Sequence, residues 1–175
     1  TEEAFTFAIH IPYYVKPEDK RVSLTVNGEK LDMQGLMKKG YAYITRKWQD
    51  GDVVEMEFPM EVRKAYANQH VREDAGCVAL LRGPVVYCFE GVDNGDLIQS
   101  LRIPKELKAE AVTCEEGVLK GNVLLKFEGL RMVGSDELYS EEPPVKEKAQ
   151  MTAIPYYAWA NRGENQMRVW MQEEA

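Results

Sequence analysis

Two glutamates at alternate positions, Glu55 and Glu57, have a spacing that could do chemistry. Glycoside hydrolysis uses two carboxyl groups roughly 5 to 9 Å apart, and alternate residues of one strand lie about 7 Å apart on the same face. Both glutamates alternate with apolar residues, Val54, Met56 and Phe58, which is typical of a strand with one face in water. We interpret them as surface carboxylates, keep catalysis as the alternative, and assign no catalytic residue in this chain.

Metal binding and thiol chemistry are the second kind of function that we consider. The cysteines and histidines are Cys77, Cys88, Cys114, His10 and His70. A zinc site usually has two of its ligands two to four residues apart, and no two of these residues are that close. We therefore predict no metal site and no cofactor in this chain. An odd number of widely spaced cysteines favours a reducing compartment, so we expect a cytoplasmic location.

Aromatic residues gather in the closing stretch "TAIPYYAWANRGENQMRVWM", which includes Tyr156, Tyr157 and Trp159. Planar tyrosine and tryptophan rings could stack on sugars, but such residues more often fill cores and subunit interfaces. We take core or interface as the main interpretation. A sugar-binding surface made by these three residues is the alternative.

Strands are the elements that would position these residues. Apolar residues alternate with others in "FTFAIHI", where Phe5, Phe7, Ile9 and Ile11 predict one buried face. Similar strand patterns occur at 22–26, 41–48, 53–58 and 123–127, and 85–89 is apolar enough to be buried on both faces. No segment has a helical period over three turns. The sequence predicts an all-β protein built from antiparallel β-sandwiches.

An internal echo indicates two such sandwiches. "HIPYYV" at 10–15 and "AIPYYA" at 153–158 share four residues, and in each case an apolar strand follows after a polar turn. Hairpin-rich sequence ends near residue 61, and a polar segment runs to Gly76. We place a partial sandwich at 1–66 and a fuller sandwich at 67–175.

Charge and hydropathy exclude some partners. The chain of 175 residues has a formal net charge of -7, which disfavours nucleic acid, because phosphate binding needs clustered Lys and Arg. No apolar run approaches the roughly 20 residues of a membrane span, so we expect no membrane partner. The first residue is Thr1, which is consistent with a processed N-terminus or with a piece of a longer protein.

Three stretches, in this order, resemble a known family. They are "IHIPYYV" with "VSLTVNG" and "GYAYITRKWQDGDVVEMEFPMEVR", then "GCVALLRGPVVYCFEGVDN", and finally "AIPYYAWANRG". Together they resemble the C-terminal part of glycoside hydrolase family 127, whose best-known members are bacterial β-L-arabinofuranosidases. The resemblance covers nearly the whole chain.

The resemblance implies a catalytic (α/α)-barrel that precedes two β-sandwich domains. In that family the barrel carries a zinc-bound cysteine nucleophile and an acid/base glutamate, and no residue here matches either. We therefore expect this chain to be inactive alone, to brace its own catalytic barrel, and to form a homodimer. A carbohydrate-binding module and a self-sufficient glycosidase are the alternatives.

Overall fold

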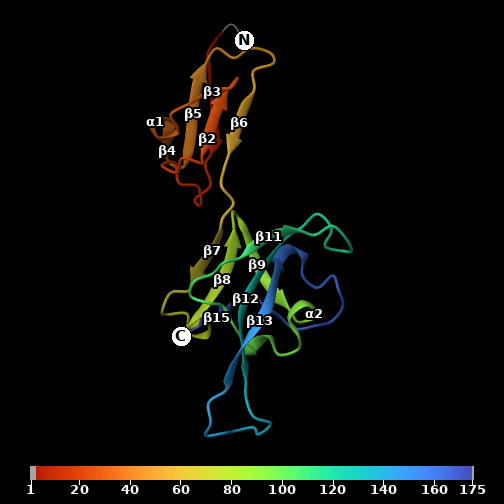
Figure 1. Ribbon diagram of the computed structural model, residues 1–175. Helices are drawn as coiled ribbons and strands as arrows, with labels where there is room; N and C mark the ends of the chain where they lie inside the picture. Colours follow the sequence, from red (N-terminus) through yellow and green to blue (C-terminus); the bar gives the residue numbers. More distant parts are fainter. Residues whose placement is uncertain (1–2, 175) are drawn as a thin grey trace. The chain divides into compact units, whose positions relative to one another are not determined.

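The computed structural model describes residues 3–174 and consists of antiparallel β-sheets with a few short helices (Figure 1). Every pairing between named strands is antiparallel, which confirms the predicted all-β class. Within the described residues, no helix is long and apolar enough to cross a membrane.

The chain divides into two compact units, Thr1–Glu61 and Val62–Ala175. This division lies earlier than the boundary that we expected after Tyr66. Residues Val62–Tyr66 form strand β7, which pairs along β8 (Cys77–Arg82), from Val62 opposite Arg82 to Tyr66 opposite Val78. The hydrogen bonds of this ladder place β7 in the second unit.

The first unit contains two three-stranded sheets. One has the order β1 (Phe5–His10), β5 (Tyr41–Arg46), β4 (Met37–Lys38), and the other has the order β3 (Glu29–Lys30), β2 (Ser23–Val26), β6 (Val54–Glu57). A single helical turn, α1 (Met33–Leu36), precedes β4. The predicted turn at Asn27-Gly28 is present, with φ of 51° and 79°.

The core of the first unit includes residues from both sheets, among them Ile9, Leu24, Val26 and Ile44. The alternation in β1 predicts Phe5 and Phe7 in this core, but their side chains remain 47% and 44% exposed. Both rings instead pack beside Trp48, with centroids 5.8 and 5.9 Å from the indole. The alternation gave the correct face of the strand, and only its second half is covered.

The second unit is built on one sheet with the order β10-β12-β13-β9-β8-β15. Its strands are β10 (Leu101–Arg102), β12 (Val123–Val133), β13 (Val145–Pro155), β9 (Val85–Glu90), β8 and β15 (Met171–Gln172), with β7, β11 (Glu110–Thr113) and β14 (Met167–Arg168) as side pairings. The sheet curls until its ends meet, because Ile103 N–H donates to the Gln172 carbonyl at 2.9 Å and Glu174 N–H to the Ile103 carbonyl at 2.8 Å.

From Tyr87 onward strand β9 is buried on both faces, as its apolar sequence predicts, whereas Val86 near its start is exposed. Tyr87 and Phe89 belong to the main core cluster, whereas Cys88, on the opposite face, packs with Leu119 and Ile154. Short helical turns connect the strands: η1 (Arg72–Asp74), α2 (Gly91–Asn94), η2 (Ile98–Ser100) and η3 (Tyr156–Ala158). Because side chains alternate along β9, Glu90 points to the same side as Cys88.

Candidate functional site

The closing loop starts where β13 ends and contains the three aromatic residues singled out from the sequence. It begins with η3 (Tyr156–Ala158), and Ala160 then adopts a left-handed conformation with φ of 62°. The chain returns as β14, where Met167 pairs with Glu90. A left-handed φ is unfavourable for alanine, so other contacts must hold this turn.

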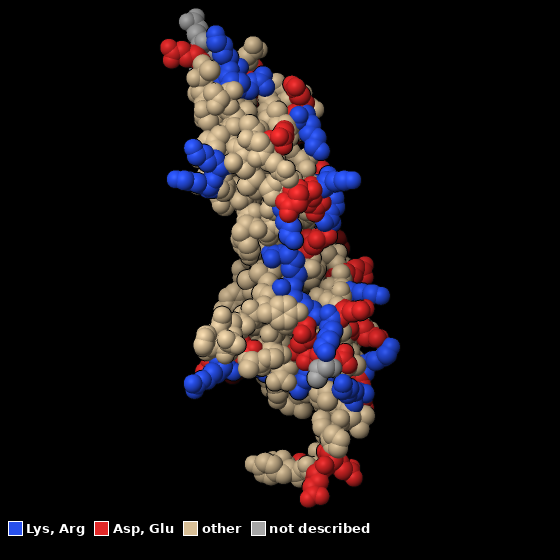
Figure 2. All heavy atoms as spheres, turned by 90° about the vertical axis from the view of Figure 1, so that its left-hand side faces the viewer, with Lys and Arg blue, Asp and Glu red and all other residues tan. Residues whose placement is uncertain are grey.

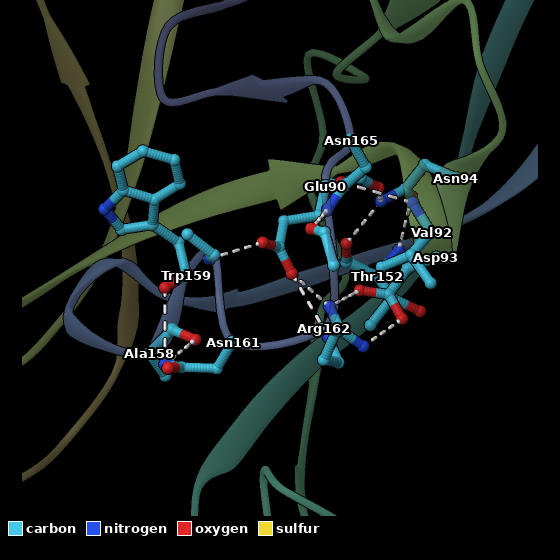
Figure 3. A network of polar contacts seen from close by, with 12 residues as sticks. Glu90, Val92, Asp93, Asn94, Thr152, Ala158, Trp159, Asn161, Arg162 and Asn165 are labelled. Atoms are coloured by element: carbon cyan, nitrogen blue, oxygen red, sulfur yellow. Dashed lines mark hydrogen bonds and ion pairs between the residues drawn. The ribbon is translucent and has the colours of Figure 1, made fainter.

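Glu90 provides those contacts from beneath the loop (Figure 3). Its side chain is fully buried, and its Oε1 accepts a hydrogen bond of 2.8 Å from the Ala160 N–H. Its Oε2 accepts bonds of 3.2 and 2.5 Å from Nε and Nη2 of Arg162. Glu90 thus accepts a hydrogen bond from the backbone of the left-handed turn and pairs with the guanidinium group of Arg162 in the same loop.

Asp93, in α2, completes the pairing of Arg162. Arg162 Nη1 donates to Asp93 Oδ1 at 2.8 Å, and Nη2 donates to Oδ2 at 2.5 Å. These hydrogen bonds to Asp93, together with those to Glu90, raise the pKa of Arg162 above its usual value. We call Glu90, Asp93 and Arg162 the ionic clamp.

Asn94 connects the ionic clamp to β13. Its Nδ2 donates to the carbonyls of Glu90 and Thr152, both at 2.9 Å, and its Oδ1 accepts the Thr152 N–H at 2.9 Å. Asn94 is itself buried. Within α2, Asp93 therefore holds the loop through Arg162, and Asn94 joins β9 to β13.

The ionic clamp has the chemistry of a structural element. All three guanidinium nitrogens of Arg162 already donate to carboxylates, and both oxygens of Glu90 are occupied. A general acid or base must reach the substrate, and the side chain of Glu90 is almost completely buried. The clamp therefore positions the loop and is closed to a substrate.

The three aromatic residues lie on the surface of this anchored loop. Tyr156, Tyr157 and Trp159 are 44%, 69% and 40% exposed, so they are not core residues of the described chain. The rings of Tyr156 and Trp159 are nearly parallel, with an interplanar angle of 23° and centroids 6.3 Å apart. Asn161 Nδ2 donates to the Ala158 carbonyl at 3.0 Å and so supports the backbone between them (Figure 3).

The other candidates from the sequence do not come together. Glu55 and Glu57 are exposed on β6, opposite Thr25 and Ser23 of β2, which is the surface position that we expected. Cys77 and Cys88 are buried and Cys114 is half-buried, and all three are free thiols. Burial raises the pKa of the Cys88 thiol to about 12. In residues 3–174, no three His, Cys, Asp or Glu side chains are grouped as metal ligands.

Sequence reasoning missed the ionic clamp. One signal was present, because Glu90 directly follows the apolar run 85–89 and continues its alternation into a buried position. Its partner Arg162 lies 72 residues away, and no local pattern joins them.

Models of two protein-domain families match the chain. The "Beta-L-arabinofuranosidase, GH127 middle domain" matches residues 1–60, and the "Glycoside hydrolase family 127 C-terminal domain" matches residues 62–172. The fold is thus that of paired β-domains from a carbohydrate-active enzyme family. The chain belongs to glycoside hydrolase family 127 and comprises its middle and C-terminal domains, as the sequence resemblance implied.

Individual relatives support the same family assignment. A "Non-reducing end beta-L-arabinofuranosidase" of Bifidobacterium longum is 34% identical over 98% of this chain. The crystal structure of a GH127 β-L-arabinofuranosidase from Geobacillus stearothermophilus T6 is 44% identical over 98% of the chain, with a TM-score of 0.89. The GH127 β-arabinofuranosidase BT3674 is 31% identical, with a TM-score of 0.85. The chain spans 26%, 27% and 28% of these three relatives, respectively.

Proposed function

We propose that this chain is the non-catalytic β-domain region of a β-L-arabinofuranosidase and that it braces a catalytic barrel. The observation that carries the proposal is the coverage: almost all of this chain corresponds to about a quarter of enzymes named for that activity. The domains that match are called middle and C-terminal. The zinc chemistry implied by the family belongs, in this proposal, to the barrel.

The aromatic residues on the closing loop suit such a contact. Tyrosine and tryptophan are enriched at protein interfaces, where their large rings lose water at little entropic cost. The ionic clamp anchors the loop before any partner binds, which lowers the cost of association. We therefore assign Tyr156, Tyr157 and Trp159 to the contact with the barrel.

The test combines this chain with the catalytic region of the Geobacillus relative. We expect the chain alone to leave an aryl β-L-arabinofuranoside intact, and its addition to raise the thermal midpoint and the turnover of the separate catalytic region. The variant Trp159→Ala should weaken this effect, whereas Val118→Ala, at an exposed position on another loop, should not. Turnover by this chain alone, lost in Glu55→Gln or Glu57→Gln, would instead identify a self-sufficient glycosidase.

A carbohydrate-binding module is the second candidate, and the exposure and near-parallel rings of Tyr156 and Trp159 favour it. An amide NMR titration with β-linked arabinofuranosyl oligosaccharides decides between the two. Shifts concentrated on the Trp159 indole would support sugar binding. An unchanged spectrum at millimolar ligand would leave the bracing role.

The proposal also includes a location and an oligomeric state. We propose a cytoplasmic protein, supported by the three free thiols, two of them buried. We also propose a homodimer, supported by exposed apolar side chains at the end of one hairpin of the second unit.

A further inference from the structure

The hairpin β12–β13 extends beyond the rest of its sheet. The two strands pair continuously from Leu125 opposite Ala153 to Val133 opposite Val145. The third strand on this side, β10, ends its pairing at Arg131, so the last residues form a ribbon of two strands. This ribbon and its connecting loop project from the second unit (Figure 1). Two-stranded ribbons in water are marginally stable by themselves.

The loop at the end of this ribbon, residues 134–144, is the part that we call the tip. Its two large apolar side chains, Leu138 and Tyr139, are 96% and 92% exposed, the highest values in the described chain among large hydrophobic residues. Side chains of this kind that are held away from any core mark contact sites. The ribbon presents both of them to solvent.

The tip is also strongly acidic. It contains four carboxylates and no Lys or Arg, and these four residues are Asp136, Glu137, Glu141 and Glu142. None of them takes part in an ion pair with another described residue. Acidic atoms gather at this end of the second unit in Figure 2. The tip therefore suits an apolar hollow with a basic rim.

The first unit has a hollow of that kind. It has a volume of about 720 Å³, between α1 and the outer face of the sheet β1-β5-β4. Leu36, Met37 and Tyr43 form the apolar part of its wall, and Thr6 and Thr45 add hydroxyl groups. Lys38 and Lys39 also line it and are both exposed, and the lining includes no carboxylate. The volume lies within the range of about 300–1,000 Å³ that is usual for ligand pockets.

We propose that the tip of one copy of this chain docks into the hollow of a second copy. Leu138 and Tyr139 enter the hollow beside Leu36 and Met37, and the carboxylates of the tip face Lys38 and Lys39. The inference rests on the homodimer proposed above and names the contact that forms it. A second copy is the occupant because apolar character and opposite charge are matched on two surfaces of the same chain.

The charges at this contact lie at an exposed rim, so they are screened by salt. Association should therefore weaken as salt is added, while the apolar pair supplies the part that salt does not remove. Truncation of central apolar anchors is usually the most costly change in an interface. We expect Leu138→Ala with Tyr139→Ala to weaken association by about tenfold or more.

The experiment measures self-association by sedimentation equilibrium from micromolar to millimolar protein. Asp136→Lys, Glu137→Lys, Glu141→Lys and Glu142→Lys together reverse the charge of the tip, and Lys38→Glu with Lys39→Glu reverses that of the hollow. Each charge-reversed variant alone should associate at least about tenfold more weakly than the unchanged chain. A mixture of the two should associate again, because each tip can then meet a hollow of opposite charge. Glu115→Lys with Glu116→Lys, in the loop between β11 and β12, is the control for a change of charge away from the tip.

Three results would overturn the inference. A chain that stays monomeric at millimolar concentration would remove both this contact and the homodimer, and it would leave the tip to a different partner. Association that neither charge reversal changes would remove this contact alone. Loss of association in both variants without recovery in the mixture would show that tip and hollow do not meet. None of these results bears on the bracing role, which is measured with the catalytic region.

Discussion

Glu90 and Arg162 form an ion pair of 2.5 Å beneath the closing loop, although 72 residues separate them in the sequence. Glu90 has 1% and Arg162 20% of its side chain exposed. The pair lies where β9 ends and the loop turns back toward it, so it determines where Tyr156, Tyr157 and Trp159 are presented. Four experiments on the isolated chain test this pair and other contacts of the second unit.

Removal of Glu90 should destabilise the second unit. Glu90→Ala leaves Arg162 with one carboxylate and the Ala160 N–H without its acceptor. Breaking a buried pair costs roughly 3–5 kcal/mol, and because Asp93 still pairs with Arg162 we expect about 3 kcal/mol. Urea unfolding measures it through Trp159 and Trp170, with Trp48→Phe removing the signal of the first unit. Lys148→Ala breaks the exposed pair with Glu128 and should cost less than about 1 kcal/mol.

The ion pair of Glu173 with Lys64 should make the second unit sensitive to acid. Lys64 Nζ lies 2.7 Å from Glu173 Oε1 and also donates to the Pro104 carbonyl at 2.6 Å. The hydrogen bond from Lys64 lowers the pKa of Glu173 below its ordinary value of 4.5. The stability that Glu173 contributes is thus present above pH 4.5 and is lost as the pH falls through the lower folded-state value.

Lys64→Met should reduce this dependence on pH, while the Tyr66 hydroxyl still donates to Glu173. Urea midpoints measured from neutral pH down to below the ordinary pKa of Glu173 should fall less steeply in Lys64→Met than in the unchanged chain. Lys120→Met removes an exposed lysine and should keep the original slope. Equal slopes in all three proteins would contradict a role for the pair in acid unfolding.

The three thiols should differ in reactivity. Burial raises the pKa of Cys88 to about 12, and Cys77 is buried too, whereas Cys114 is half-buried. Because the thiolate is the reactive form, iodoacetamide should label Cys114 first in the native chain and all three after unfolding. Peptide mass spectrometry locates the label. Early labelling of Cys88 would show that β9 opens readily.

The exposed and buried tyrosines provide a matched pair. Tyr157 is 69% exposed, whereas Tyr87 is 2% exposed and donates a hydrogen bond of 3.0 Å to the Val123 carbonyl. Tyr157→Ala should change the free energy of unfolding by no more than about 0.5 kcal/mol. Tyr87→Ala should cost about 3–5 kcal/mol, the usual value for a large core ring. A large loss in Tyr157→Ala would mean that this ring stabilises the fold.

Much of the fold follows from local pattern. Alternation predicts the strands around Phe5–His10 and Tyr41–Arg46, and Asn27-Gly28 predicts the turn. The apolar run of β9 predicts a strand with two buried faces, which holds for Tyr87, Cys88 and Phe89. These predictions succeed because alternation, turn conformation and local hydrophobicity depend on neighbouring residues. The order of the three stretches was also enough to indicate the family.

Tertiary structure decided which faces of the strands are covered and which unit each strand joins. Phe5 and Phe7 occupy the predicted face but stay half-exposed and pack beside Trp48. The pairing of β7 with β8 assigned Val62–Tyr66 to the second unit.

The sequence did not decide whether Tyr156, Tyr157 and Trp159 are exposed. Aromatic residues of the core and of the surface cannot be distinguished in the sequence of this stretch. Long-range contacts determine the position of the closing loop. Glu90 and Asp93 hold Arg162 from a distant strand and turn, and this pairing attaches the closing loop to β9 and α2. The periodicity of a sequence predicts the face of a strand on which a side chain lies. The partner of that side chain depends on which distant segment the fold places next to that face.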